Sequence, residues 1–296
     1  ILLVAVFFSY IFVSYHMALE NLQTSNKNLI LLYGKELENK LNNADMLLER
    51  LIYKNSDYDM LQSENESDRY YASVKIKSFI QEQITYDTYV DAVVIADSAY
   101  LSCLDYENTE IAFTTREALR QFTSDKASLG RAKASWDITQ IGEVNYVYKM
   151  YVWQGRAAGI FISVDHFMEN ATRNDFQNVS ILLKDDKEMV WGILGKENIS
   201  IESGDEFTGE STNNWLYENN YDLADGKMQL SAYVNMSEIF GQIRWSMVLV
   251  LFVILILAGF SGILINYLRK EMIAPMSHMQ KSMEDMQKGN YELRIK

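Results

Sequence analysis

An uncharged stretch from Trp245 to Leu268 constrains this chain more than any other feature. It runs for 24 residues without an Asp, Glu, Lys, Arg or His side chain. About 20 apolar helical residues are enough to span the hydrocarbon core of a bilayer. Arg244 precedes the stretch and Arg269 follows it, in the positions where basic side chains anchor a membrane helix. The sequence therefore predicts a transmembrane helix over residues 244–268.

A second apolar stretch, without charged residues, opens the chain at residues 1–15. It is slightly short for a complete span. A signal peptide would begin with a basic region and end in a small-residue cleavage site, and neither is present here. We therefore expect residues 1–16 to be the end of a first transmembrane helix that is truncated at its N-terminus.

The charge is divided unevenly along the chain. Residues 1–243 carry 36 acidic and 20 basic side chains, whereas residues 269–296 carry 4 acidic and 6 basic ones. Basic residues beside a membrane helix favour the cytoplasm. The expected topology is a cell-membrane protein with two spans, residues 17–243 outside and the C-terminus inside. The strong negative charge outside argues against nucleic acid as a partner.

The first part of the outer region, residues 17–84, has the apolar spacing of helices. Between Leu22 and Tyr53 the apolar side chains recur at intervals of mostly three and four, which predicts a helix of about 32 residues. It is expected to be a rigid spine as well as a core-facing helix. A second helix is predicted over Tyr70–Ile84, capped by Ser67 and Asp68.

Residues 85–165 change to the alternation of strands, interrupted by one helix. They predict a membrane-distal, PAS-like sensor unit with mixed helix and sheet. The expected strands are Val90–Ala96, Tyr100–Leu104, Ala134–Thr139, Val144–Trp153 and Ala157–Val164, and the helix is Thr115–Phe122.

Residues 166–243 predict a smaller, membrane-proximal unit. Asp165 is expected to cap a helix over residues 166–176. Two hairpins follow, one across Asp185, Asp186 and Lys187 and one across Ala224, Asp225 and Gly226. The fold class expected for the whole outer region is α+β.

Aromatic side chains gather in the predicted strands of the membrane-distal unit. Tyr146 and Tyr148 fall on one face of their strand, and Tyr151 falls on the other. These rings, with Trp136 and Asp105, are candidate ligand-binding residues suited to a sugar, a nucleoside or a small peptide. The alternative is that the rings only pack in the core. Neither a catalytic nor a metal-binding motif is visible in the sequence.

The cytoplasmic end has methionines spaced four, three, four and three residues apart, which is the a/d spacing of a coiled coil. This predicted signalling seam comprises Met272, Met276, Met279, Met283 and Met286. Pro275 precedes most of it, and Gly289 is a usual helix stop. Together with Asn290 and the Leu293-Arg294-Ile295 end, the pattern resembles the first helix and connector of a HAMP module, which residues 269–296 would begin.

The order of these parts resembles a double-Cache receptor, and the methionine and glycine spacing is most similar to YesM-type bacterial sensor histidine kinases. The resemblance implies an extracellular ligand sensor that forms a parallel homodimer. It also implies a cytoplasmic kinase region beyond residue 296, which would use ATP and Mg²⁺ and act on a response regulator. His278 lacks the acidic residue and the proline of a phospho-accepting box, so the present chain is expected to carry no catalytic residue and no cofactor. A chemoreceptor with the same front end and a membrane-anchored surface binding protein are the alternatives.

Overall fold

The computed structural model describes residues 2–84, 89–100, 102–108, 111–169, 179–195 and 216–287. The chain divides into two units, residues 21–236 and a second unit formed by residues 1–20 and 237–296.

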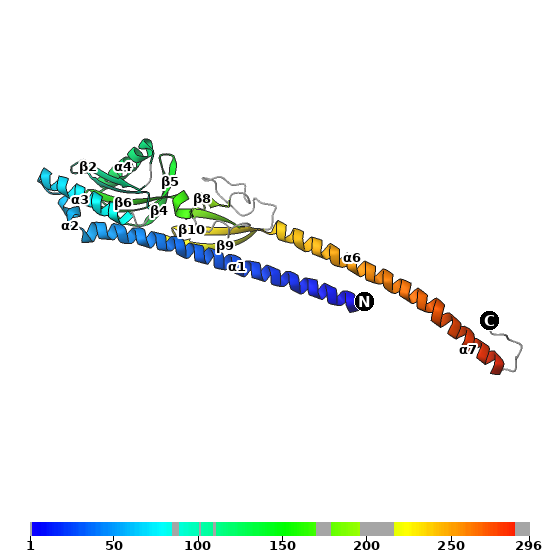
Figure 1. Ribbon diagram of the computed structural model, residues 1–296. Coiled ribbons are helices and arrows are strands. Elements are labelled where there is room, and N and C mark those ends of the chain that lie inside the picture. Colours follow the sequence, from blue (N-terminus) through cyan, green and yellow to red (C-terminus); the bar gives the residue numbers. More distant parts are fainter. Residues whose placement is uncertain are drawn as a thin grey trace. The chain divides into compact units, whose positions relative to one another are not determined.

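Helices and antiparallel sheets share the first unit, as the α+β prediction requires (Figure 1). The helix α1, Leu2–Glu49, enters the unit at residue 21 and continues as a π-helical segment, Arg50–Lys54. The remaining helices of this unit are α2 (Ser56–Met60), α3 (Glu66–Ile84), α4 (Phe113–Ser128) and α5 (Val164–Met168).

The first sheet has the strand order β2-β1-β6-β5-β3, with β4 also paired to β5, and every pairing is antiparallel. It lies within the range predicted for the membrane-distal unit. Its strands are β1 (Ala92–Asp97), β2 (Ser102–Glu107), β3 (Arg131–Ala132), β4 (Trp136–Ile141), β5 (Val144–Trp153) and β6 (Arg156–Ser163).

The second sheet has the order β8-β7-β10-β9 and is also antiparallel. Both predicted hairpins are present in it. A left-handed backbone at Ala224 and Asp225 closes the second hairpin. The strands are β7 (Val179–Asp185), β8 (Val190–Leu194), β9 (Leu216–Leu223) and β10 (Met228–Asn235), with a 3₁₀ turn at Ala224–Gly226.

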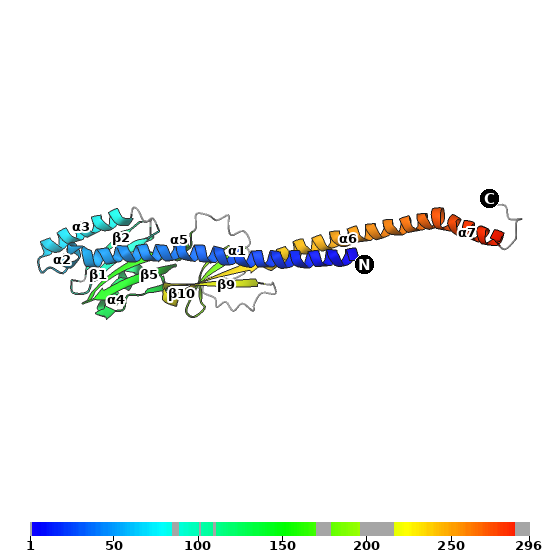
Figure 2. The same cartoon turned by 90° about the horizontal axis from the view of Figure 1, so that it is seen from below.

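The predicted spine, α1, packs against both sheets and shares its largest core cluster with them (Figure 2). Its buried side chains repeat every three or four residues, so they form one stripe along the helix. Gly34 lies where β9 meets this helix, and a Cβ there would come within 2.3 Å of the Tyr221 ring. The buried stripe comprises Ile30, Tyr33, Leu37, Leu41, Ala44, Leu47, Leu48 and Leu51.

Three helix starts differ from the prediction, and one of them is α4, which begins at Phe113 rather than at Thr115. The helix α3 begins at Glu66, and the side chain of Asn65 accepts a hydrogen bond from the Ser67 amide, so Ser67 and Asp68 lie inside the helix. Ser163 caps α5 by accepting from the His166 amide at 3.3 Å, which places Asp165 in the first turn. For α3 and α5, an oxygen-bearing side chain two residues before the first predicted cap residue performs the cap. The predicted helix over 166–176 ends at Met168, and residues 170–178 lie outside the described residues.

The second unit contains α6, Met236–Leu268, which follows β10 in the chain without an intervening loop. Within the part of the chain that the structure describes, one helical stretch, Arg244–Lys281, is long and apolar enough to cross a membrane. Its large apolar side chains are exposed, for example Leu249 and Phe252 at 64% and 62%. A stretch of this kind needs an apolar surrounding, because exposed Leu and Phe side chains are unfavourable in water. The first span predicted over residues 1–16 stays a prediction.

A π-helical segment, Arg269–Ile273, joins α6 to α7, Ala274–Gln287. Pro275 has no amide proton, so it cannot make the helical bond to residue 271, and the wider turn just before it accommodates this loss. The methionines at 272, 276, 279 and 283 are between 54% and 71% exposed. Gly289 lies outside the described residues, and the structure does not describe the side chain of Met286.

Candidate functional site

The strand register of the first sheet divides the predicted ligand-binding residues between its two faces. Asp105 pairs with Val94, whose side chain packs with Tyr146 and Tyr148 on the face covered by α4. Trp136 pairs with Lys149 and packs with Val147 on the opposite face, which α1 covers. Directly paired residues share a face in an antiparallel sheet.

The structure therefore brings Asp105, Tyr146 and Tyr148 to one face, and it does not bring Trp136 or Tyr151 together with them. The sequence predicted that Tyr151 lies on the other strand face from Tyr146 and Tyr148, and the register places Trp136 on that other face as well. The reason is the period of a strand, because residues on adjacent strands share a face only when the register allows it.

On the α4 face, four rings form a continuous aromatic group. Tyr148 stacks on Phe161 at 6.0 Å between ring centroids and meets Phe122 of α4 edge-on at 5.2 Å. Tyr146 meets Phe161 edge-on at 6.1 Å. Burial, with the charges of Asp91 and Glu107, raises the pKa of Tyr146 to about 12. Burial, with the charge and hydrogen bond of Asp137, raises the pKa of Tyr148 to about 12. Both phenols are therefore protonated at neutral pH and keep their hydroxyl as a donor.

Two arginines of α4 pair with two carboxylates of β2 on the same face of the sheet as these rings. Arg120 Nη2 donates to Asp105 Oδ1 at 2.7 Å, and Arg116 Nη2 donates to Glu107 Oε2 at 2.6 Å. Burial alone would raise the pKa of Asp105, but hydrogen bonds with Arg120 and Glu107 and the arginine charges lower it overall. The carboxylate is therefore ionised at neutral pH.

We name the eight residues of this group the α4-face cluster. Among the described residues, Arg120 Nε is buried in it without a hydrogen-bond partner. The cluster thus offers charged donors and acceptors beside aromatic faces, the combination with which proteins orient small polar molecules. It comprises Asp105, Glu107, Arg116, Arg120, Phe122, Tyr146, Tyr148 and Phe161.

Sequence reasoning missed Glu107, Arg116 and Arg120. A local signal exists for all three, since two acids stand two residues apart on one strand and two arginines stand four apart on one helix. Such spacings place each pair on one face. Nothing in the sequence says that the strand pair and the helix pair meet.

Trp136 and Tyr151 on the other face belong to the contact with α1. Lys149 forms an ion pair with Asp45 of α1 at 2.6 Å, and its Nζ lies 5.6 Å from the Tyr151 ring and 6.0 Å from the Trp136 ring. Tyr53 meets Tyr151 edge-on. These contacts give both rings a packing role; whether any of the five predicted residues binds a ligand stays a prediction.

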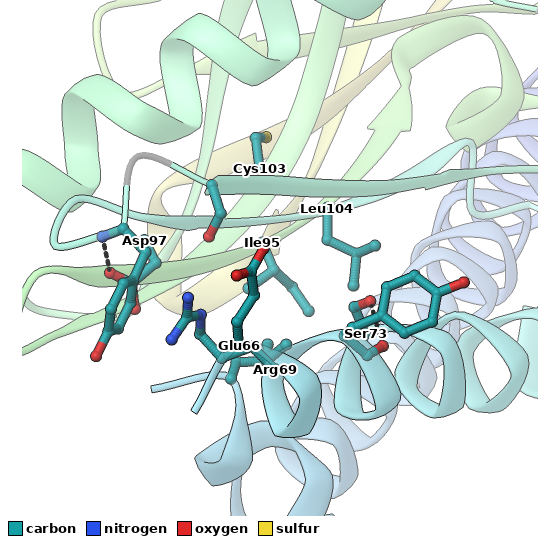
Figure 3. Close-up of a pocket in the computed structure, with 11 residues that line it drawn as sticks. Glu66, Arg69, Ser73, Ile95, Asp97, Cys103 and Leu104 are labelled. Carbon is teal, nitrogen blue, oxygen red and sulfur yellow. Dashed lines mark hydrogen bonds between the residues drawn. The ribbon is translucent and has the colours of Figure 1, made fainter. Parts of the chain in front are cut away.

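A separate cavity of about 400 Å³ lies between α3 and the strands β1 and β2 (Figure 3). Its walls combine charged, hydroxyl and apolar side chains. It is lined by Leu61, Glu66, Arg69, Tyr70, Ser73, Ile95, Asp97, Tyr100, Ser102, Cys103 and Leu104.

No protein-family model matches the chain, and no curated protein matches it. Several solved structures are similar to it. The ligand-binding domain of Campylobacter jejuni chemoreceptor Tlp3 in complex with L-norvaline has a TM-score of 0.46 and 12% identity, with 76% of this chain and 93% of that chain covered. The sensor domain of the V. cholerae histidine kinase DctB has a TM-score of 0.45 and 10% identity, with coverages of 75% and 98%.

The ligand-binding domain of the Pseudomonas aeruginosa PAO1 amino acid chemoreceptor PctC in complex with GABA has a TM-score of 0.40 and 12% identity, with coverages of 70% and 97%. Sensor domains of histidine kinases and of chemoreceptors are thus both among these structures. The scores and identities are too low for any of them to carry a function over to this chain.

Proposed function

We propose that this chain is the ligand-sensing and transmembrane-signalling part of a bacterial receptor with a double-Cache ectodomain. The observation that carries the proposal is the continuity of the chain after the second sheet. Asn235 ends β10, Met236 begins α6, and the helix continues through the candidate span into the methionine-bearing α7. This continuous helix connects the sheet-bearing unit to the other side of a membrane, so a conformational change in that unit can be transmitted along it.

The proposed location is the cell membrane, with two spans and the sheet-bearing unit outside. The uneven charge supports this orientation, since basic residues follow the second span. We expect alkaline phosphatase fused after Asp225 to be active and the same enzyme fused after Gln287 to be inactive. An inactive fusion at Asp225 in a stably expressed protein would contradict the orientation.

The α4-face cluster is the proposed site for a small extracellular ligand, whether a sugar, a nucleoside or a short peptide. Asp105→Asn keeps the size of the side chain and removes its charge, and Arg120→Gln removes the partner. Each is expected to weaken binding about tenfold or more, since charge-assisted hydrogen bonds contribute roughly 1.5–3 kcal/mol. Calorimetric titration of the solubilised full chain, after a thermal-shift screen of these ligand classes, measures the effect.

Arg131→Gln is the matched control for these variants. Arg131 belongs to β3 of the first sheet, is exposed, and stacks its guanidinium on the Trp153 ring at 4.9 Å, outside the cluster. The Arg131→Gln variant is expected to bind the ligand with the same affinity as the parent chain. If Asp105→Asn and Arg120→Gln fold normally and bind as tightly as the parent, the cluster is not the site.

For the cytoplasmic signalling output, we propose that the receptor is a YesM-type histidine kinase. It forms a parallel homodimer and acts on a response regulator. The methionine spacing and the Pro275 position support this choice over a chemoreceptor or a surface binding protein. Transfer of phosphate from ATP to a histidine of the full-length gene product separates the kinase from both alternatives.

A further inference from the structure

The cavity between α3 and the strands β1 and β2 is lined by a carboxylate, Glu66, to which the described residues supply no side-chain partner. Figure 3 shows Glu66 reaching from the first turn of α3 toward Ile95 and Leu104 of the strands. Within the described residues, neither a hydrogen bond nor an ion pair joins Glu66 to another side chain. Glu66 lines the cavity and is exposed to solvent, so its carboxylate is accessible to a donor from solution.

The nearest basic residue on the same helix, Arg69, is engaged elsewhere. Its Nη1 donates to the carbonyl oxygens of Ser63 at 2.8 Å and Glu64 at 3.0 Å. Its guanidinium carbon lies 4.2 Å from the centroid of the Tyr100 ring. Residues three apart on a helix are neighbours and ordinarily pair when their charges are opposite. Here the loop carbonyls and the ring hold the guanidinium away from Glu66.

The second carboxylate of the cavity, Asp97, is by contrast satisfied. Its Oδ1 accepts from the Ala99 amide at 2.8 Å, and its Oδ2 accepts from Gln62 Nε2 at 3.0 Å. Asp97 and Arg69 therefore tie the loop before α3 to the turn between β1 and β2. These contacts fix one wall of the cavity before any ligand arrives.

The rest of the lining is apolar or aromatic. Ile95 and Leu104 form part of the core on this side, and the Tyr70 ring is 66% exposed at the rim. An ammonium group gains a charge-assisted hydrogen bond from a carboxylate and attraction from an aromatic face. The apolar side chains suit the carbon body attached to such a group.

We propose that this cavity is a second binding site, for a small organic amine, with Glu66 as the acceptor of its ammonium group. The amine's carbon body lies against Ile95 and Leu104, with Tyr70 and Tyr100 beside it. The site is distinct from the α4-face cluster, because Ile95 and Leu104 lie on the face of the sheet opposite Asp105.

The test is a calorimetric titration of the solubilised full chain with 2-phenylethylammonium, and with 2-phenylethanol as its neutral counterpart. The parent chain is expected to bind the amine saturably and at least tenfold more tightly than the alcohol. Glu66→Gln is expected to remove that preference. Glu64→Gln, a substitution of the same kind outside the cavity, is expected to bind like the parent, and thermal unfolding checks that both variants fold.

Three results would overturn the site. They are the absence of saturable amine binding, equal binding by amine and alcohol, and unchanged amine affinity in Glu66→Gln. Asp105→Asn distinguishes the two sites, because it is expected to leave amine binding intact. Loss of amine binding in Asp105→Asn with retention in Glu66→Gln would assign the amine to the α4-face cluster instead.

Discussion

Replacement of Phe167 by alanine is expected to lower the free energy of unfolding by about 3–5 kcal/mol, the usual cost of removing a fully buried phenylalanine. Phe167 is 0% exposed and belongs to the core that α1 shares with both sheets. It is the fourth residue of α5, a helix of only five residues. A helix this short is not stable in isolation, so its packing in the core and the hydrogen bonds to its backbone must stabilise it.

Those contacts come from α1 and from the first sheet. Tyr33 donates its hydroxyl to the Met168 carbonyl at 2.6 Å, and Lys40 Nζ donates to the Phe167 carbonyl at 3.1 Å. At the middle of α5, His166 Nδ1 lies 2.5 Å from Oδ1 of Asp91, the residue that precedes β1. Burial raises the pKa of Tyr33 and lowers the pKa of Lys40. The helix α5 is therefore fastened between α1 and the sheet that carries the α4-face cluster.

Chemical denaturation of the solubilised full chain, followed by tryptophan fluorescence, measures the effect. Phe113→Ala is the matched control, because Phe113 begins α4 and is 70% exposed. That control is expected to change the free energy of unfolding by no more than about 0.5 kcal/mol. Equal losses in the two variants would show that the packing around α5 is not what stabilises the unit.

Sequence reasoning succeeded where a pattern is local and repeated. The three-and-four spacing from Leu22 to Tyr53 predicted the part of α1 that carries the buried stripe, and the observed bounds of β5 match the predicted strand Val144–Trp153. Each signal is repeated over many residues, so a single exception does not obscure it.

Sequence reasoning failed at the ends of helices, where neighbouring residues are equally suited to cap or to continue the helix. Asp165 and Ser163 are both good caps, and only the end of β6 at Ser163 decides between them. Likewise α4 extends to Ser128, well past the predicted end at Phe122, because Thr123 and Ala127 continue its buried stripe. Helix ends depend on what the last turn packs against, which local sequence does not specify.

The α4-face cluster could be predicted only in part, for a related reason. Tyr146 and Tyr148 stand out in a single strand, but the pairing of Arg120 with Asp105 spans a strand and a helix. Such a contact depends on the register of β1 with β2 and on the orientation of α4. Both are consequences of the whole fold.

Disulfide cross-linking in α7 is expected to follow the methionine stripe. The side chains of Met276, Met279 and Met283 are 65%, 54% and 71% exposed, and they repeat at the a/d spacing of a parallel coiled coil. Large apolar side chains in a regular stripe on a helix favour a second copy of the same helix, since burial of each contributes roughly 1.5–3 kcal/mol at most. Cys103→Ala removes the only native thiol and supplies the background for single cysteines.

Cysteines in place of Met276, Met279 or Met283 are expected to form disulfide dimers several-fold more efficiently than cysteines in place of Ser277 or Lys281, which lie off the stripe. Gel analysis after mild oxidation of membranes measures the yields. Methionine is flexible and specifies packing weakly, so the seam can adopt two arrangements that differ by only a few kcal/mol. A ligand that binds one arrangement better would then change the relative yields along the stripe. Equal yields on and off the stripe would refute the pairing, and yields that a bound ligand leaves unchanged would refute the switch while the pairing stands.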